Sequence, residues 1–141
     1  MKKMRFILLT VLIGSLFACQ RETVATPMES TKTLNGTWKV IKAVRNGTDL
    51  TNRFDFSGFK ISFKDSIYTM DSLVPFPVVT NGTFHLDDPK YPFKIFLKEA
   101  GSDFKSLDME FPIAHGVRNI IFNFSPGCTS NTYQYTLQKV N

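Results

Sequence analysis

Residues 57–64 have the sequence Ser-Gly-Phe-Lys-Ile-Ser-Phe-Lys. Apolar Phe59, Ile61 and Phe63 alternate in it with lysine and serine. Successive side chains of a β-strand point to opposite faces, so this spacing predicts a strand with one face in a core and the other in solvent.

The same alternation recurs along the chain between clusters of turn residues. It appears in residues 37–45, 57–64, 67–70, 78–86, 93–98, 107–111, 117–124 and 132–140. About eight short strands in this order predict an all-β fold: a single antiparallel meander that closes, or nearly closes, into a β-barrel. Residues 50–54 are the only helical candidate, a turn or two that would plug one end of the barrel.

Turn signals separate the predicted strands. Asn46-Gly47 ends the first strand, Asp65-Ser66 joins the second to the third, and Asp87-Asp88-Pro89 precedes the fifth. Asn81-Gly82 falls inside the fourth segment, where it predicts either a bulge or a division of the strand.

The first eighteen residues have the three parts of a secretion signal. A basic start precedes a mainly apolar run of twelve residues, too few to span a bilayer. The run ends in Leu16-Phe17-Ala18-Cys19, which resembles the lipobox of bacterial lipoproteins. That resemblance implies diacylglyceryl transfer to the Cys19 thiol, cleavage before Cys19 and acylation of the new amine. The alternatives are an ordinary thiol after a conventional signal peptide, and an uncleaved anchor.

Three parts are expected along the chain: a signal peptide (1–18), a lipidated cysteine with a flexible tether (19–33), and one barrel domain (34–141). The tether is predicted because residues 20–33 lack helical or alternating periodicity. Three of the 17 Lys and Arg lie in the leader, so the mature chain, with its 12 Asp and Glu, has a net charge of only +2. This balance gives no support to a nucleic-acid partner.

If Cys19 is acylated, Cys128 has no partner for an intramolecular disulfide. The core alone must then hold the fold. Twelve phenylalanines remain after the leader, and each contributes about 1.5–3 kcal/mol when fully buried. We expect Cys128 to be a small buried apolar residue, with a reactive thiol as the alternative.

Leu34-Asn35-Gly36-Thr37-Trp38 opens the first predicted strand. Its Gly36 and Trp38 resemble the Gly-x-Trp motif of lipocalins and other calycin-like barrels, in which the tryptophan packs across the closed end. The chain departs from true lipocalins, because it is shorter and lacks their second and third motifs.

Longer strings resemble the lipocalin-like lipoprotein domains of unknown function that are common in Bacteroidota, and the resemblance covers most of residues 34–141. These strings are Phe54-Asp55-Phe56-Ser57, Leu86-Asp87-Asp88-Pro89-Lys90-Tyr91-Pro92-Phe93 and Phe124-Ser125-Pro126-Gly127-Cys128. The resemblance implies a lipocalin-like barrel and an outer-membrane or cell-surface lipoprotein. It brings no catalytic residues, because none is established for that family.

His85, His115 and Cys128, the main titratable candidates, show no recognised catalytic or metal-binding spacing. We therefore predict no catalytic site, metal or cofactor. Asp87-Asp88 has the oxygen ligands that Ca²⁺ accepts, but Asp-Asp-Pro is more often a turn. Asp65-Ser66-Ile67 and Asp71-Ser72-Leu73 resemble the short O-glycosylation site of exported Bacteroidota proteins.

An eight-stranded barrel is just wide enough either to fill with side chains or to hold one small molecule. Short strands and many phenylalanines favour a filled barrel. The alternative is an aromatic platform of Tyr91, Tyr133, Tyr135 and Trp38 for a sugar or an apolar ligand.

The predicted function is a non-enzymatic binding or interaction module, held at the cell envelope by the lipid on Cys19. The expected location is the outer membrane, and the sequence does not distinguish its periplasmic leaflet from its surface leaflet. The expected partner is a small apolar molecule, a glycan or an envelope protein. The alternative is a structural or accessory lipoprotein with a filled barrel and no small-molecule site. An envelope enzyme would need a polar cleft with a perturbed carboxylate, histidine or cysteine.

Overall fold

The computed structural model describes residues 30–71 and 74–140. The predicted leader, Cys19 and two residues of a predicted glycosylation site, Ser72 and Leu73, lie outside the described residues. Apolar–polar alternation builds the strands, as in β3, where Ile61 and Phe63 are buried between exposed lysines. The strands are β1 (Gly36–Arg45), β2 (Thr48–Asp49), β3 (Lys60–Lys64), β4 (Ile67–Met70), β5 (Gly82–Leu86), β6 (Lys94–Glu99), β7 (Lys105–Glu110), β8 (Ile113–Ala114), β9 (Val117–Phe124) and β10 (Tyr133–Lys139).

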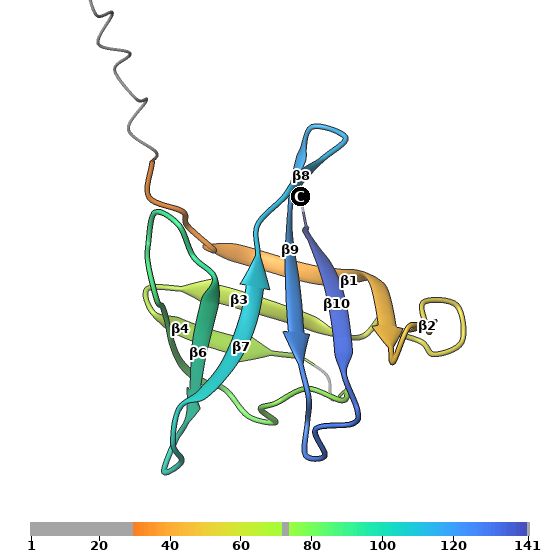
Figure 1. Ribbon diagram of the computed structural model, residues 1–141. Helices are drawn as coiled ribbons and strands as arrows, with labels where there is room; N and C mark the ends of the chain where they lie inside the picture. Colours follow the sequence, from red (N-terminus) through yellow and green to blue (C-terminus); the bar gives the residue numbers. More distant parts are fainter. Residues whose placement is uncertain (1–29, 72–73, 141) are drawn as a thin grey trace, which may run out of the picture.

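Eight of these strands close into an antiparallel barrel in the order β1-β3-β4-β5-β6-β7-β9-β10, with β10 pairing back to β1. The two short strands extend it, β2 on β1 and β8 on β9. In Figure 1 the chain enters at one end of β1, which pairs along its length with β10. The predicted all-β meander and its closure into a barrel are confirmed.

Two of the predicted turns take the backbone form that tight hairpins need. Asn46 and Gly47 have φ angles of 47° and 78°, and Asp65 and Ser66 have φ angles of 48° and 66°. Positive φ at both central residues matches the right-handed twist of the flanking strands. Asn46-Gly47 therefore turns β1 into β2, and Asp65-Ser66 turns β3 into β4.

The fourth predicted strand, 78–86, is wrong in its first half, because β5 begins only at Gly82. Val78 is buried in the core instead of alternating along a strand. The backbone amides of Val79 and Thr80 donate to the Glu99 carboxylate at 2.8 Å each, so they are not available to a strand ladder.

Residues 50–54 form one hydrogen-bonded turn instead of a helix. The Leu50 carbonyl accepts from the amides of Arg53 and Phe54 at 2.9 and 3.1 Å, and no second helical turn continues from it. Nowhere in residues 30–71 and 74–140 is there a helix long and apolar enough to cross a membrane.

Trp38 closes one end of the barrel. Its indole is buried, donates from Nε1 to the Leu34 carbonyl at 2.7 Å, and lies 6.3 Å from the Phe111 ring between centroids. Gly36 has a φ of 121°, and a Cβ there would lie 2.4 Å from Cε of Lys139. The chain therefore enters the barrel through a close contact between its first and last strands.

Side chains fill the barrel interior, and several of them come from loops. The buried apolar residues on strands are Trp38, Ala43, Ile61, Phe63, Tyr68, Ile95, Leu97, Leu107, Met109, Ile120, Phe122, Phe124, Tyr135 and Leu137. Loops add Leu34, Phe56, Phe59, Phe76 and Val78.

Residues 74–80, which we call the plug loop, insert Phe76 into the core from the end opposite Trp38. The Phe76 ring packs at centroid distances of 5.7 Å from Phe59, 5.2 Å from Phe124 and 6.5 Å from Tyr135. Dense packing of this kind makes the loop part of the hydrophobic core.

Gly82 lies at the shortest joint of the barrel, where β4 and β5 share only two residue pairs. A Cβ at Gly82 would lie 2.0 Å from the carbonyl oxygen of Lys98 and 2.9 Å from the Tyr68 hydroxyl. Because a backbone atom cannot move aside cheaply, only glycine lets β5 approach its neighbours this closely.

Phe76→Ala is expected to lower the free energy of unfolding by about 3–5 kcal/mol, because it leaves a cavity among packed rings. The measurement is urea unfolding followed by the fluorescence of Trp38, the single tryptophan of the chain. The matched control is Phe93→Ala, whose side chain is 70% exposed. Similar losses in the two variants would contradict a core role for the plug loop.

Gly82→Ala is expected to destabilise the barrel by about 2 kcal/mol or more, because the added methyl overlaps the Lys98 carbonyl. The control is Gly101→Asn: nothing lies within 4 Å of a Cβ there, and asparagine tolerates the φ of 77°. Equal urea midpoints for the two variants would show that β4 and β5 do not approach so closely in solution.

Candidate functional site

The barrel end opposite Trp38 opens into a pocket of about 300 Å³, which we call the mouth pocket. Its lining combines two guanidinium groups with apolar and aromatic side chains. The lining residues are Arg45, Leu50, Arg53, Phe54, Phe56, Pro75, Tyr133 and Tyr135.

Arg45 reaches the pocket because it is the last residue of β1. It pairs with Tyr133 of β10, and its guanidinium carbon lies 5.6 Å from the centre of the Tyr133 ring. Its Nη2 donates to Oδ1 of Asn131 at 2.8 Å. The cation–π contact and the hydrogen bond together orient the guanidinium at the rim.

Arg53 comes from the turn that follows β2, and that turn is attached to β1. The Leu50 amide donates to the Ala43 carbonyl at 2.8 Å, and the Ala43 amide donates to Oγ1 of Thr51 at 3.1 Å. The turn therefore stays at the rim and holds Arg53 beside the pocket.

The plug loop forms another wall of the mouth pocket through Pro75. The Tyr135 hydroxyl donates to the Pro75 carbonyl at 2.9 Å. Burial raises the pKa of Tyr135, which keeps its hydroxyl protonated as a donor at neutral pH.

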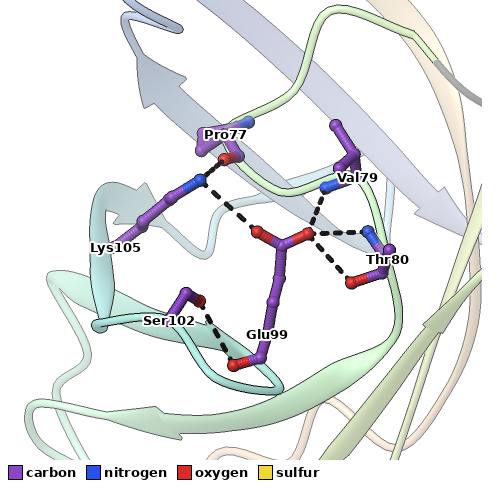
Figure 2. A network of polar contacts seen from close by, with 6 residues as sticks. All are labelled: Pro77, Val79, Thr80, Glu99, Ser102 and Lys105. Carbon is purple, nitrogen blue, oxygen red and sulfur yellow. Dashed lines mark hydrogen bonds and ion pairs between the residues drawn. The ribbon is translucent and has the colours of Figure 1, made fainter.

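Glu99, at the end of β6, holds the other end of the plug loop (Figure 2). Its Oε1 accepts from the amides of Val79 and Thr80 at 2.8 Å each, and from Oγ1 of Thr80 at 3.0 Å. Nζ of Lys105 donates to the Pro77 carbonyl at 2.7 Å and lies 3.4 Å from Oε2 of Glu99. We call this set of contacts the Glu99 latch.

The hydrogen bonds of the latch, led by that from the Val79 amide, lower the pKa of Glu99 below its ordinary value. Glu99 is therefore ionised at neutral pH, when its hydrogen bonds are strongest. Nearby, the Tyr68 hydroxyl is buried and has no hydrogen-bond partner among the described residues. Burial and the Glu99 charge raise the pKa of Tyr68 to about 12, so this hydroxyl stays neutral.

A second hollow, an open groove of about 820 Å³, runs over the outside of the barrel. Its lining residues are Val44, Asn46, Gly47, Lys94, Ser106, Asp108, Asn123, Phe124, Ser125, Thr132, Tyr133 and Gln134. Several of its polar groups already pair with one another: Lys94 with Asp108 at 3.0 Å, and Gln134 with Asn123 at 2.9 Å. The mouth pocket is the stronger candidate site, because its two arginines keep N–H donors that no described residue uses, beside apolar walls.

Comparison with known families adds one match. A family model described as "Domain of unknown function (DUF5004)" matches residues 17–138. The chain belongs to the DUF5004 family. No curated protein and no solved structure matches it. The family and the closed eight-stranded barrel together fit a lipocalin-like barrel.

In this DUF5004 domain, the two histidines lie on separate elements. His85 of β5 stacks on Phe96 at a centroid distance of 4.7 Å, and the exposed His115 sits in the β8–β9 turn with a φ of 51°. No group of three or more His, Cys, Asp or Glu side chains gathers in a metal-binding arrangement within the described ranges.

Asp87-Asp88-Pro89 is a turn in which both carboxylates bind backbone amides. Oδ1 of Asp87 accepts from Phe93 and Lys94 at 3.0 Å each, and Oδ1 of Asp88 accepts from Lys90 at 2.6 Å. The carboxylates thus satisfy the amides of the β5–β6 connection, as the turn interpretation expects.

The expectation that Cys128 is buried is wrong: its side chain is exposed in the loop between β9 and β10. Gly127 has a φ of 97°, and the Asn131 amide donates to the Cys128 carbonyl at 2.9 Å, which keeps this turn outside the barrel. Sγ of Cys128 lies 3.2 Å from Oγ of Ser130, and this hydrogen bond lowers the pKa of the thiol.

The proposed platform of four aromatic residues is also wrong. Tyr133 and Tyr135 share the mouth pocket, but Trp38 closes the opposite end and Tyr91 lies exposed in the β5–β6 connection. Strand register explains the split, because Trp38 and Tyr135 lie at different levels of the β1–β10 pair.

Sequence reasoning missed the arginines and the loop residues of the site. Arg45 carried one usable signal, a charge just before the Asn46-Gly47 turn at the end of a strand. No sequence signal pointed to Arg53 or Pro75, because these residues come together only when two loops fold back over one end of the barrel.

Glu99→Gln is expected to lower the free energy of unfolding by about 1 kcal/mol at pH 7, because neutral hydrogen bonds replace charge-assisted ones. The folded-state pKa of Glu99 lies below the ordinary value of 4.5, so its stabilisation is present above pH 4.5 and is lost as the pH falls through the folded-state pKa. Urea unfolding from pH 7 downward should show the two stabilities converging in acid.

The matched control for the latch is Glu110→Gln, which removes the same charge from an exposed position on β7. It should leave the stability close to that of the wild type. A constant difference between wild type and Glu99→Gln at all pH values would contradict a role for the ionised carboxylate.

Proposed function

We propose that this DUF5004 chain is a lipid-anchored, non-enzymatic binding module of the bacterial cell envelope, which recognises its partner at the mouth pocket. In this proposal the lipid on Cys19 holds the protein at the outer membrane, as in the lipocalin-like lipoproteins of Bacteroidota that its motifs resemble. The barrel is the scaffold that carries the pocket.

The observation that carries the proposal is that the chain enters the barrel at one end of β1, whereas the mouth pocket lies at the other end. The Lys32 amide donates to the Pro89 carbonyl at 2.7 Å, so the end of the tether is fixed near the barrel end that Trp38 closes. Arg45, at the far end of β1, lines the pocket. A lipid before the tether would therefore leave the pocket facing away from the membrane.

Exposed aromatic side chains at the tether end support the same orientation. Tyr91 and Phe93 lie in the connection that binds Lys32, and both are more than half exposed. Aromatic rings are favoured at membrane–water interfaces, so this end suits a position near lipid.

The ionisable groups at the mouth favour binding over catalysis. Arg45 and Arg53 supply guanidinium N–H donors, and burial raises the pKa of Tyr135 and so keeps its hydroxyl protonated. Such groups bind anions and stack on rings, but they do not exchange protons readily near pH 7.

A second candidate function is that of an accessory envelope lipoprotein without a small-molecule site. The filled interior favours it, because Phe76 and Val78 occupy the volume in which an open barrel would hold a ligand.

The anchoring is tested by labelling bacteria that express the full chain with radioactive palmitate. Cys19→Ala is expected to abolish the label and to release the protein from the membrane fraction. Cys128→Ala, which removes the other cysteine, is the matched control and should keep both. A labelled Cys19→Ala variant, or an unlabelled wild type, would refute the proposal.

A further inference from the structure

We infer that the mouth pocket binds a small amphipathic carboxylate, with the apolar body between the rings of the pocket and the carboxylate on the guanidinium groups of Arg45 and Arg53. This inference deepens the proposed function by naming the ligand class of the same site. It concerns one small molecule at the rim, because side chains already fill the interior.

The walls of the pocket suit a flat or short apolar body. Leu50 and Pro75 provide aliphatic surface, and the ring centroids of Phe54 and Phe56 lie 5.0 Å apart in an edge-to-face arrangement. Phe54 is 50% exposed, so part of its ring is open to a ligand in the pocket. The volume of about 300 Å³ is at the lower end of the range for small-molecule sites, which suits a bicyclic ring or a short acyl chain.

The charge of the pocket lining specifies an anion. Among the described residues that line it, the only formally charged side chains are the two arginines, and none is acidic. Asp49, which interacts electrostatically with Arg53, accepts the Thr51 amide at 2.8 Å through its Oδ1. The backbone therefore engages one oxygen of this carboxylate, and Asp49 is not part of the pocket lining.

Both guanidinium groups keep donors for a ligand. Among the described residues, the Arg45 guanidinium donates one hydrogen bond, from Nη2 to Asn131, whereas a guanidinium has five N–H donors. The Arg53 side chain makes no hydrogen bond or ion pair with any described residue. Two parallel N–H groups match the two oxygens of a carboxylate, so arginine binds this group with defined geometry.

The binding test uses 2-naphthoate as the probe and the unlipidated chain from residue 20 to 141, which retains every strand and all core residues of the closed barrel. Isothermal titration at pH 7 and low salt should show one site. The neutral analogue 2-naphthalenemethanol has the same rings without the charge, and it should bind at least about fivefold more weakly.

Three variants locate the site. Arg53→Gln should weaken naphthoate binding about fivefold and leave the affinity for the neutral alcohol unchanged. Phe54→Ala should weaken the binding of both compounds, because it removes a ring from the pocket wall. Lys39→Gln, which removes one positive charge from an exposed position on β1 away from the pocket, is the matched control and should change neither affinity.

Equal affinities for the acid and the alcohol would overturn the assignment of an anion. Unchanged naphthoate binding in both Arg53→Gln and Phe54→Ala, or no binding at millimolar probe, would overturn the site itself. The urea midpoint from Trp38 fluorescence checks that each variant is folded. The chain in this titration carries no lipid. A failed binding test therefore contradicts the ligand class without contradicting the anchoring at Cys19, and a failed palmitate-labelling test does the reverse.

Discussion

The packing of Phe76 inside the barrel is the interaction on which the other features of this structure depend. Eight strands enclose a space that side chains must fill, and here a loop supplies one of the central rings. The plug loop thus cannot move without disturbing the packing against Phe124 and Tyr135. A connection that would otherwise be an ordinary surface loop becomes part of the core.

Holding Phe76 in place requires polar contacts on both sides of it. Before it, the Pro75 carbonyl accepts from Tyr135, and after it the amides of Val79 and Thr80 donate to Glu99. Amides without strand partners would be costly near the core, so an ionised carboxylate is an effective acceptor for them. The latch and the core therefore stabilise one another.

Because side chains fill the interior, the mouth pocket lies at the rim of the barrel and not at its centre. The mouth pocket is what remains between the plug loop, the turn at residues 50–54 and the ends of β1 and β10. Arg45 and Arg53 lie there with aromatic neighbours, at the end of β1 remote from the tether. The same strand therefore separates the barrel end near Lys32 from the end that carries the mouth pocket.

Local sequence patterns were enough to predict the all-β class, most of the barrel strands and the tight turns at Asn46-Gly47 and Asp65-Ser66. Strand periodicity is a local property, so residues 67–70 and 117–124 were predicted with their observed bounds, and Asn46-Gly47 required its turn because both residues tolerate positive φ. Three features became known from the tertiary structure alone. Residues 78–81 are not part of a strand, Cys128 is exposed, and a particular set of side chains forms the mouth pocket. Those outcomes depend on strand register and on loops that fold back over one barrel end, and contacts between residues far apart in the chain leave no local periodicity to read.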